Sequence, residues 1–130
     1  MPTWTWPATR DATSGTRATL EEMLLARASV TSKGTIADSS ELIKQAVAKE
    51  ANAIGYDSIG FVDKTVTAVS IDGVQANAKS VLSGSYLMGR QLYVMSKSKP
   101  TGLSAKFIDY LRSPECQKEI VAKEGYIGLK

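Results

Sequence analysis

Apolar residues recur three and four positions apart in several stretches of the chain, the spacing that places side chains on one face of a helix. The first such helix is predicted from about Thr16 to Arg27. The second is predicted to begin with a capping box formed by Asp38 and Glu41 and to end near Glu50. The buried stripe of this second helix is expected to consist of Leu42, Ile43, Ala46 and Val47.

Three more helices are predicted in the second half of the chain. A short one covers Ala76–Leu82 and is stopped by Gly84. In the last helix Ser113 is the cap, Pro114 fills the first turn and Gly125 ends the element. The apolar residues that mark the two C-terminal helices are Leu103, Phe107, Ile108 and Leu111 in the first, and Ile120 and Val121 in the second.

Strand patterns alternate with these helices. Residues 3–6, T-W-T-W, alternate polar and aromatic side chains and are predicted to form a short strand that ends at Pro7. Such alternation of strands and helices is typical of an α/β fold with a small mixed or mainly parallel sheet flanked by helices. The remaining predictions are strands at Ala53–Tyr56, Thr65–Ile71 and Gln91–Met95, a turn at Asp72-Gly73 and a loop over Ala28–Ala37.

Size and charge narrow the class of protein. With 130 residues, 43% of them hydrophobic and 22% charged, residues 1–130 are expected to form a single domain. The net charge of +3 is small and dispersed, which does not favour a nucleic-acid partner. No apolar run approaches the roughly 20 residues that span a bilayer. The start M-P-T-W-T-W-P has neither the basic nor the apolar part of a signal peptide, so none is expected in this chain.

The chain has no histidine and one cysteine, Cys116. This composition removes the usual general base, the usual zinc ligand and every Ser-His or Cys-His nucleophile pair, so no metal or other cofactor is expected. Cys116 is expected to be a buried small apolar residue. A phosphatase that uses Ser14 finds no support in paired carboxylates or a Walker-type motif. The composition therefore favours a binding protein over an enzyme.

The stretch R-D-A-T-S-G-T-R, residues 10–17, carries the candidate binding chemistry. It precedes a predicted helix, whose N-terminus offers unpaired N–H groups and a partial positive charge to an anion. Gly15 allows close backbone approach, Ser14 and Thr16 add hydroxyl donors, and Arg10 and Arg17 add planar cationic forks. These five residues are predicted to bind a tetrahedral oxyanion.

A plain structural role explains part of the same stretch. Serine and threonine are ordinary N-caps, and glycine is an ordinary turn residue. Arg17 lies four residues before Glu21, so the two can pair on the helix surface instead of contacting a ligand. A simple helix cap does not require Arg10 and Arg17. From the residues alone, both the oxyanion site and the plain cap stay open as interpretations.

Three stretches, taken in order, resemble the phosphate-binding protein family, the extracytoplasmic receptors that supply ABC transporters. They are S-G-T-R at 14–17, A-N-A-I-G-Y-D-S-I-G-F-V at 51–62 and K-P-T-G-L-S-A-K-F-I-D-Y-L-R-S-P-E-C-Q-K-E-I-V-A-K-E-G-Y-I at 99–127. The resemblance covers nearly the whole chain from Arg10 onward. It implies one lobe of a two-lobed, type II periplasmic-binding-protein fold, here the second lobe and the C-terminal segment that returns to the first. It also implies inorganic phosphate as ligand and an ABC permease as partner.

The family's phosphate loop usually reads R-x-D-G-S-G-T, which aligns its arginine, serine, glycine and threonine with Arg10, Ser14, Gly15 and Thr16. The family's aspartate, which accepts the proton of protonated phosphate, falls on Ala12. A site made only of donors suits sulfate as well as phosphate. The resemblance therefore implies oxyanion binding and leaves the choice of oxyanion open.

Several further predictions depend on the missing first lobe. The lone lobe is expected to bind phosphate weakly or not at all, and its exposed edges invite a homodimer or a segment swap through the closing Y-I-G-L-K. Tyr56, Asp57 and Ser58 come near a predicted strand end, where ligands of α/β proteins usually bind, and a turn is the role favoured for them. Packing is favoured over covering of exposed apolar surface for Trp4 and Trp6, and a hinge is a candidate role for Arg90 and Tyr93.

Overall fold

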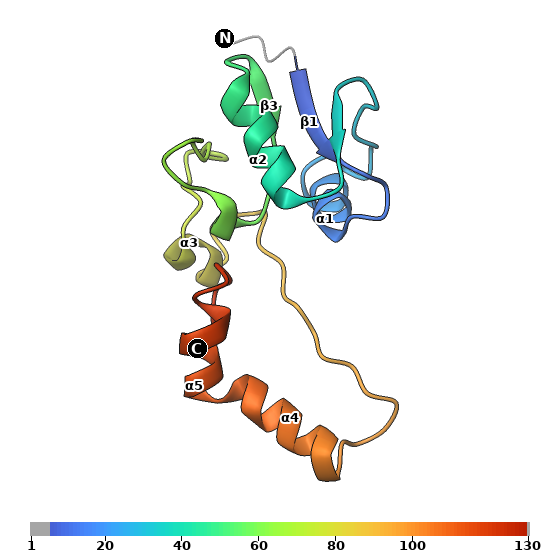
Figure 1. Ribbon diagram of the computed structural model, residues 1–130, viewed down its shortest axis with the longest axis vertical. Helices are drawn as coiled ribbons and strands as arrows, with labels where there is room; N and C mark the ends of the chain where they lie inside the picture. The colour runs from blue at the N-terminus through green and yellow to red at the C-terminus, as the bar shows by residue number, and fades with distance from the viewer. Residues whose placement is uncertain (1–5, 130) are drawn as a thin grey trace. The chain divides into compact units, whose positions relative to one another are not determined.

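The computed structural model in Figure 1 describes residues 6–129. It contains two compact units, the first ending at Gly89 and the second beginning at Arg90. In the described residues no helix is both long and apolar enough to cross a membrane. Trp4 and the side chain of Trp6 lie outside the described part of the chain, so the roles predicted for them stay predictions.

The first unit is built on a three-stranded parallel sheet with strand order β2-β1-β3. β1 (Trp6–Arg10) is central, and β2 (Thr35–Ala37) and β3 (Ala53–Gly55) pair along its two sides. Because parallel strands need crossover connections, a helix follows each of the first two strands along the chain. These helices are α1 (Gly15–Met23) and α2 (Ser40–Lys49). The α/β class with a mainly parallel sheet is confirmed.

The core of this unit is small. Ala8 of β1, Ala37 of β2 and Ile43 of α2 are buried together, and Ala46 and Val47 pack against them. The stripe predicted for α2 thus forms the core contact. Leu42, the remaining member of that stripe, is exposed instead.

The N-cap of α2 differs from the prediction. Ser39, and not Asp38, has the extended backbone of a cap residue, and its Oγ accepts the N–H of Leu42 at 3.4 Å. Asp38 lies one residue too early to reach that amide. Glu41, assigned to the capping box, instead pairs with Lys44 at 3.0 Å. The capping-box prediction is therefore wrong, although the helix itself is present.

Residues 3–5 of the predicted first strand lie outside the described residues, and Pro7 lies within β1 rather than at its end. Pro7 pairs with Ile54 of β3, whereas the register with β2 starts at Ala8. The proline is tolerated because it lies outside the β1–β2 ladder. On that side Gly34 approaches so closely that a Cβ on it would lie 2.2 Å from the Pro7 carbonyl oxygen.

Two boundaries near α1 also differ from the predictions. The helix ends at Met23, because Ala26 and Arg27 adopt left-handed backbone angles, with φ of 48° and 71°. The predicted loop over Ala28–Ala37 contains β2, a strand of three residues. So short a strand shows no alternating pattern in sequence, and it forms because it pairs with β1.

The rest of the first unit contains a 3₁₀ turn, η1 (Ile59–Phe61), and a short helix, α3 (Ala78–Leu82). Thr65–Ile71 is not a strand, and only Ile71 pairs, with Val74 across the confirmed Asp72-Gly73 turn. α3 begins two residues later than predicted because Asn77 caps it, and Gly84 follows it with a left-handed φ of 75°.

The second unit contains α4 (Gly102–Arg112), α5 (Pro114–Cys116) and the π-helix η2 (Gln117–Val121). Ser113 caps α5 as predicted, since its Oγ accepts the N–H of Cys116 at 3.2 Å, and Cys116 is buried. Gln91–Met95 is not a strand in the described chain. The apolar faces predicted for the two C-terminal helices are largely exposed to solvent. Their exposed side chains include Leu103, Phe107 and Ile120.

Candidate functional site

The loop between β1 and α1 holds the candidate oxyanion site. Ser14 is the N-cap of α1, is buried, and accepts the Arg17 N–H through Oγ at 3.3 Å. Its own N–H donates to the Asp11 carbonyl at 3.2 Å. The plain capping role is therefore present. A hydroxyl that accepts one hydrogen bond still has its own proton to donate.

Gly15 and Thr16 are the first two residues of α1, at the positive end of the helix dipole. No acidic residue lies in this first turn. Within residues 6–129 the backbone N–H of Thr16 has no protein acceptor, as is usual for the first turn of a helix. The helix end is therefore open to an anion.

Arg10, the last residue of β1, lies directly before this loop. Its Nη2 donates to the Asp38 carbonyl at 3.0 Å, and its backbone N–H donates to the Tyr56 hydroxyl at 3.0 Å. The Nε atom of Arg10 is buried and has no hydrogen-bond partner in the described chain. A buried donor without an acceptor is costly, so this guanidinium retains capacity for an oxygen ligand.

Arg17 is held inside the protein by all three nitrogens of its guanidinium. Nε pairs with Glu21 at 2.8 Å, Nη1 donates to the Arg10 carbonyl at 3.1 Å, and Nη2 donates to the Val30 carbonyl at 3.2 Å. The bond with Glu21 raises the pKa of Arg17 and lowers that of Glu21. The predicted pairing with Glu21 is confirmed, and a ligand contact by Arg17 would have to replace one of these bonds.

Asp11 is occupied by its own turn. Its Oδ1 accepts the Thr13 N–H at 2.8 Å and also accepts the Thr13 hydroxyl. The hydroxyl bond is the main reason why the pKa of Asp11 lies below its usual value. This carboxylate is ionised at neutral pH and is held within the loop.

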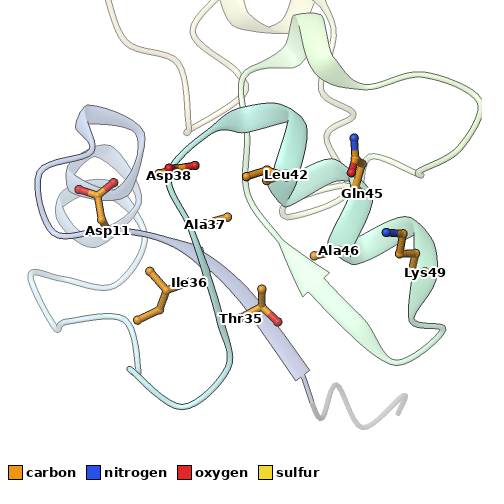
Figure 2. A pocket seen from close by; sticks show the side chains of 9 residues that line it. All are labelled: Asp11, Thr35, Ile36, Ala37, Asp38, Leu42, Gln45, Ala46 and Lys49. Carbon is orange, nitrogen blue, oxygen red and sulfur yellow. The ribbon is translucent and has the colours of Figure 1, made fainter.

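Figure 2 shows a pocket of about 550 Å³ beside β2 and α2. Asp11 and Asp38 contribute acidic side chains, and Lys49 contributes a basic one. Neither Ser14 nor Thr16 lines this pocket, so it is distinct from the helix end that carries the candidate oxyanion donors. Its lining residues are Asp11, Thr35, Ile36, Ala37, Asp38, Leu42, Gln45, Ala46 and Lys49.

Tyr56 follows β3 directly and supports the site; the sequence made it a strand-end candidate and favoured a turn. Its hydroxyl lies 2.6 Å from the Thr9 Oγ1 and receives the Arg10 N–H, so it joins the carboxyl ends of β3 and β1. Of its neighbours, Asp57 accepts the Ser58 N–H at 2.7 Å through Oδ1, while its Oδ2 is buried without a partner. The sequence signal for Tyr56 is its position just after a predicted strand, because carboxyl ends of parallel strands share one edge. Its bonds to Thr9 and Arg10 could not be predicted, since they depend on the pairing of β1 with β3.

The described residues contain no cluster of three or more histidine, cysteine or acidic side chains suited to a metal ion. The groups gathered at the β1–α1 loop are instead backbone N–H groups, hydroxyls and a guanidinium. Such groups bind an anion reversibly and supply neither a nucleophile–base pair nor a metal-bound water.

Comparison with known proteins places the chain in a class of binding proteins. Residues 7–115 match the family described as PBP superfamily domain. Because the match covers most of the chain, this protein belongs to the PBP superfamily.

The relatives within this superfamily are phosphate-binding proteins. The phosphate-binding protein PstS of Bacillus subtilis is 41% identical over 121 residues, which is 92% of this chain and 40% of that protein. A Clostridium perfringens phosphate ABC transporter substrate-binding protein, solved with bound phosphate, is 37% identical with a TM-score of 0.78, and the match covers 96% of this chain and 52% of that one. A phosphate-binding protein from Streptococcus pneumoniae is 29% identical with a TM-score of 0.81, over 93% of this chain and 50% of that one.

These comparisons confirm the resemblance to the phosphate-binding protein family, since each of these relatives is named for phosphate binding or transport and none of the three is named for an enzymatic activity. This chain spans 40% of the B. subtilis protein and about half of each of the two solved structures.

Proposed function

We propose that this chain binds inorganic phosphate as part of a substrate-binding protein that serves an ABC transporter. The observation that carries the proposal is that the two elements flanking the β1–α1 loop each offer a donor without a protein acceptor in the described residues. These are the open N–H of Thr16 at the start of α1 and the buried, unpartnered Nε of Arg10 at the end of β1. Relatives named for phosphate binding make phosphate the first choice among oxyanions.

In the proposed site, Arg10 supplies a charged hydrogen bond, Ser14 supplies its hydroxyl, and Thr16 supplies its hydroxyl and its backbone N–H, while Gly15 allows close approach of the backbone. Charge-assisted hydrogen bonds of this kind are roughly twice as strong as neutral ones. The ligand undergoes no chemical change, because capture and release are the whole function. Arg17 takes part chiefly by holding the loop against β1, through its bond to the Arg10 carbonyl.

The choice between phosphate and sulfate depends on an acceptor. Protonated phosphate has a proton to donate, whereas sulfate at neutral pH has none. Ala12 stands where the family's aspartate accepts that proton, and Asp11 is engaged with Thr13. The four residues proposed as ligands are therefore expected to discriminate weakly between the two anions.

The affinity of this chain by itself is proposed to be low. It spans about half of the solved relatives, so it contributes only part of a cradle and leaves the anion in contact with water. The complete receptor is proposed to work outside the cytoplasm and to pass phosphate to a membrane permease.

A titration of the ¹⁵N-labelled chain with phosphate tests the site. Saturable shifts of the Gly15 and Thr16 amides in the millimolar range are expected, and sulfate should give similar shifts. Arg10→Met should weaken binding by roughly tenfold or more through loss of a charged hydrogen bond. Arg27→Met removes the same charge from an exposed position and should leave binding unchanged. Amides that do not respond would reject the site, and micromolar affinity would reject the low-affinity proposal.

A second proposal concerns what the chain does when no ligand is held. The sheet has two open edges, and Ile36 of the edge strand β2 is 56% exposed. Open strand edges with apolar side chains pair with other edges, so self-association is the alternative function proposed for this chain. Light scattering across a concentration series should reveal a dimer, and a monomer at all concentrations would count against it.

A further inference from the structure

An open strand edge and a pocket lie together in the first unit. β2 is an edge strand, since it pairs with β1 on one side only. All three of its residues line the pocket shown in Figure 2, and α2 supplies most of the other lining residues. Ile36, in the middle of β2, is 56% exposed. An open strand edge with an exposed apolar side chain is a surface to which another strand can add.

The two ends of this pocket carry opposite charges. Asp38 follows the carboxyl end of β2 directly, and Lys49 is the last residue of α2. Because α2 connects two parallel strands, it runs back along the sheet and places Lys49 at the end opposite Asp38, as Figure 2 shows. Within residues 6–129 neither side chain has a hydrogen-bond or ion-pair partner. Each charge is therefore available to an ionic partner from outside this chain.

We infer, building on the self-association proposed above, that this edge pairs antiparallel with β2 of a second copy, about a twofold axis at Ile36. A twofold axis brings the same surface of each copy together. The acidic end of one pocket then faces the basic end of the other, so that Lys49 of each copy lies near Asp38 of the other. Ile36 packs against its own counterpart, which removes exposed apolar surface from water. The interface therefore combines a strand ladder, an apolar contact and two identical charge pairs.

Charge favours this arrangement over the others that the two sheet edges allow. Parallel pairing of two β2 strands would bring Asp38 near Asp38 and Lys49 near Lys49, and like charges opposed across strands are destabilising. The second edge strand, β3, is flanked by Glu50 and Asp57. Its antiparallel self-pairing would bring these carboxylates together. Antiparallel pairing of β2 is thus the arrangement in which opposite charges meet.

Light scattering of the full 130-residue chain, in a concentration series without phosphate, tests the charge pairs. Lys49→Glu and Asp38→Lys should each raise the dissociation constant of the dimer by roughly tenfold or more, because each change acts at two symmetric contacts. An equimolar mixture of the two variants should recover the dimer, since their charges are complementary again. Lys64→Glu, the same reversal at an exposed side chain outside the pocket, should leave the dissociation constant unchanged. All three side chains are exposed, so circular dichroism should show the same fold in every variant.

A disulfide across the twofold axis tests the register of the two strands. Residues directly opposite each other in an antiparallel pair have Cα atoms about 4.5–5.5 Å apart, a separation that a disulfide can bridge. Ile36→Cys should therefore give a cross-linked dimer on air oxidation, detected by mass spectrometry of the unreduced protein. Ile54→Cys makes the same change at the exposed middle residue of β3 and should cross-link much more slowly. Cys116 is buried and is present in both variants.

Three results would overturn this interface. The first is a dimer that tolerates both charge reversals, or one that does not return when the two variants are mixed. The second is cross-linking of the β3 variant at least as fast as that of the β2 variant. The third is a monomer at every concentration, which would also reject the self-association itself. Failure of the phosphate proposal affects none of these results, because no measurement here contains phosphate.

Discussion

At the scale of single residues, the carboxyl end of β1 is shaped by side chains that the ligand would not need to touch. The Tyr56 hydroxyl accepts the backbone N–H of Arg10, and the Arg17 guanidinium donates to the backbone carbonyl of the same residue. Asp38 contributes its backbone carbonyl to the Arg10 guanidinium. Two bonds thus fix the backbone of Arg10 and one holds its guanidinium before any anion arrives, which reduces the entropy lost on binding.

Asp63 gives a residue-scale prediction with a defined pH window. Its Oδ1 accepts the Thr65 hydroxyl at 2.5 Å and the Thr65 N–H at 2.8 Å, and Oδ2 pairs with Lys44 at 3.2 Å. These bonds lower the pKa of Asp63 from 3.8 to about 2. The carboxylate therefore adds stability above pH 4, and this contribution is lost as the pH falls toward 2.

An NMR titration of Asp63 checks this prediction. Thr65→Ala removes the largest cause of the shift and should move the midpoint upward, toward the ordinary aspartate value. Lys44→Met removes a smaller cause and should move it less. A midpoint that stays in place in the Thr65→Ala variant would show that the hydroxyl bond does not hold this carboxylate in its charged form.

At the scale of elements, the two candidates for the cap of α2 give a matched pair of substitutions. Ser39→Ala removes the acceptor for the Leu42 N–H and should lower the free energy of unfolding by about 1 kcal/mol. Asp38→Ala changes a neighbouring exposed side chain that makes no cap bond and should cost much less. Urea unfolding of both variants decides the matter, and equal losses would contradict the cap assignment.

The sequence predicted an element correctly where residues close together in the chain define that element. α2, the Asp72-Gly73 turn and the Ser113 cap all depend on residues close to each other in the chain. β2 was missed because three residues carry no pattern and the strand exists only by pairing with β1. Thr65–Ile71 and Gln91–Met95 show the opposite failure, since strand-forming residues make no strand without a neighbour to pair with.

The candidate site was predictable to a similar degree. The β1–α1 loop follows from a glycine and hydroxyl residues ahead of a helix, and the structure places Ser14 at the N-cap as that pattern indicates. The engagement of Arg17 with the Val30 carbonyl could not be read from sequence, because it depends on how the connection after α1 folds back. Tyr56 lies 46 residues from Arg10, and the parallel pairing of β1 and β3 brings the two together.

At the scale of the whole molecule, the hydrophobic core of the first unit is small. Among the described residues of this unit, Ile43 is the one large buried aliphatic side chain, and it packs with Ala8 and Ala37. Ile43→Ala should therefore cost about 2–5 kcal/mol, enough to unfold much of a marginally stable domain. Thermal unfolding followed by circular dichroism measures the loss. Leu42→Ala, at the exposed neighbour on the same helix, should have a small effect, and comparable losses would contradict this picture of the core.

The burial of Cys116 gives this chain a built-in reporter. It is the single thiol in the sequence, and only 2% of the residue is exposed, within the second unit. An alkylating reagent can reach the sulfur only when the structure around Cys116 opens, so the labelling rate measures how often this opening occurs with no probe added to the protein. Mass spectrometry of the intact chain would detect each alkylation as one mass increment. The rate of this increase would give the rate of local opening around Cys116.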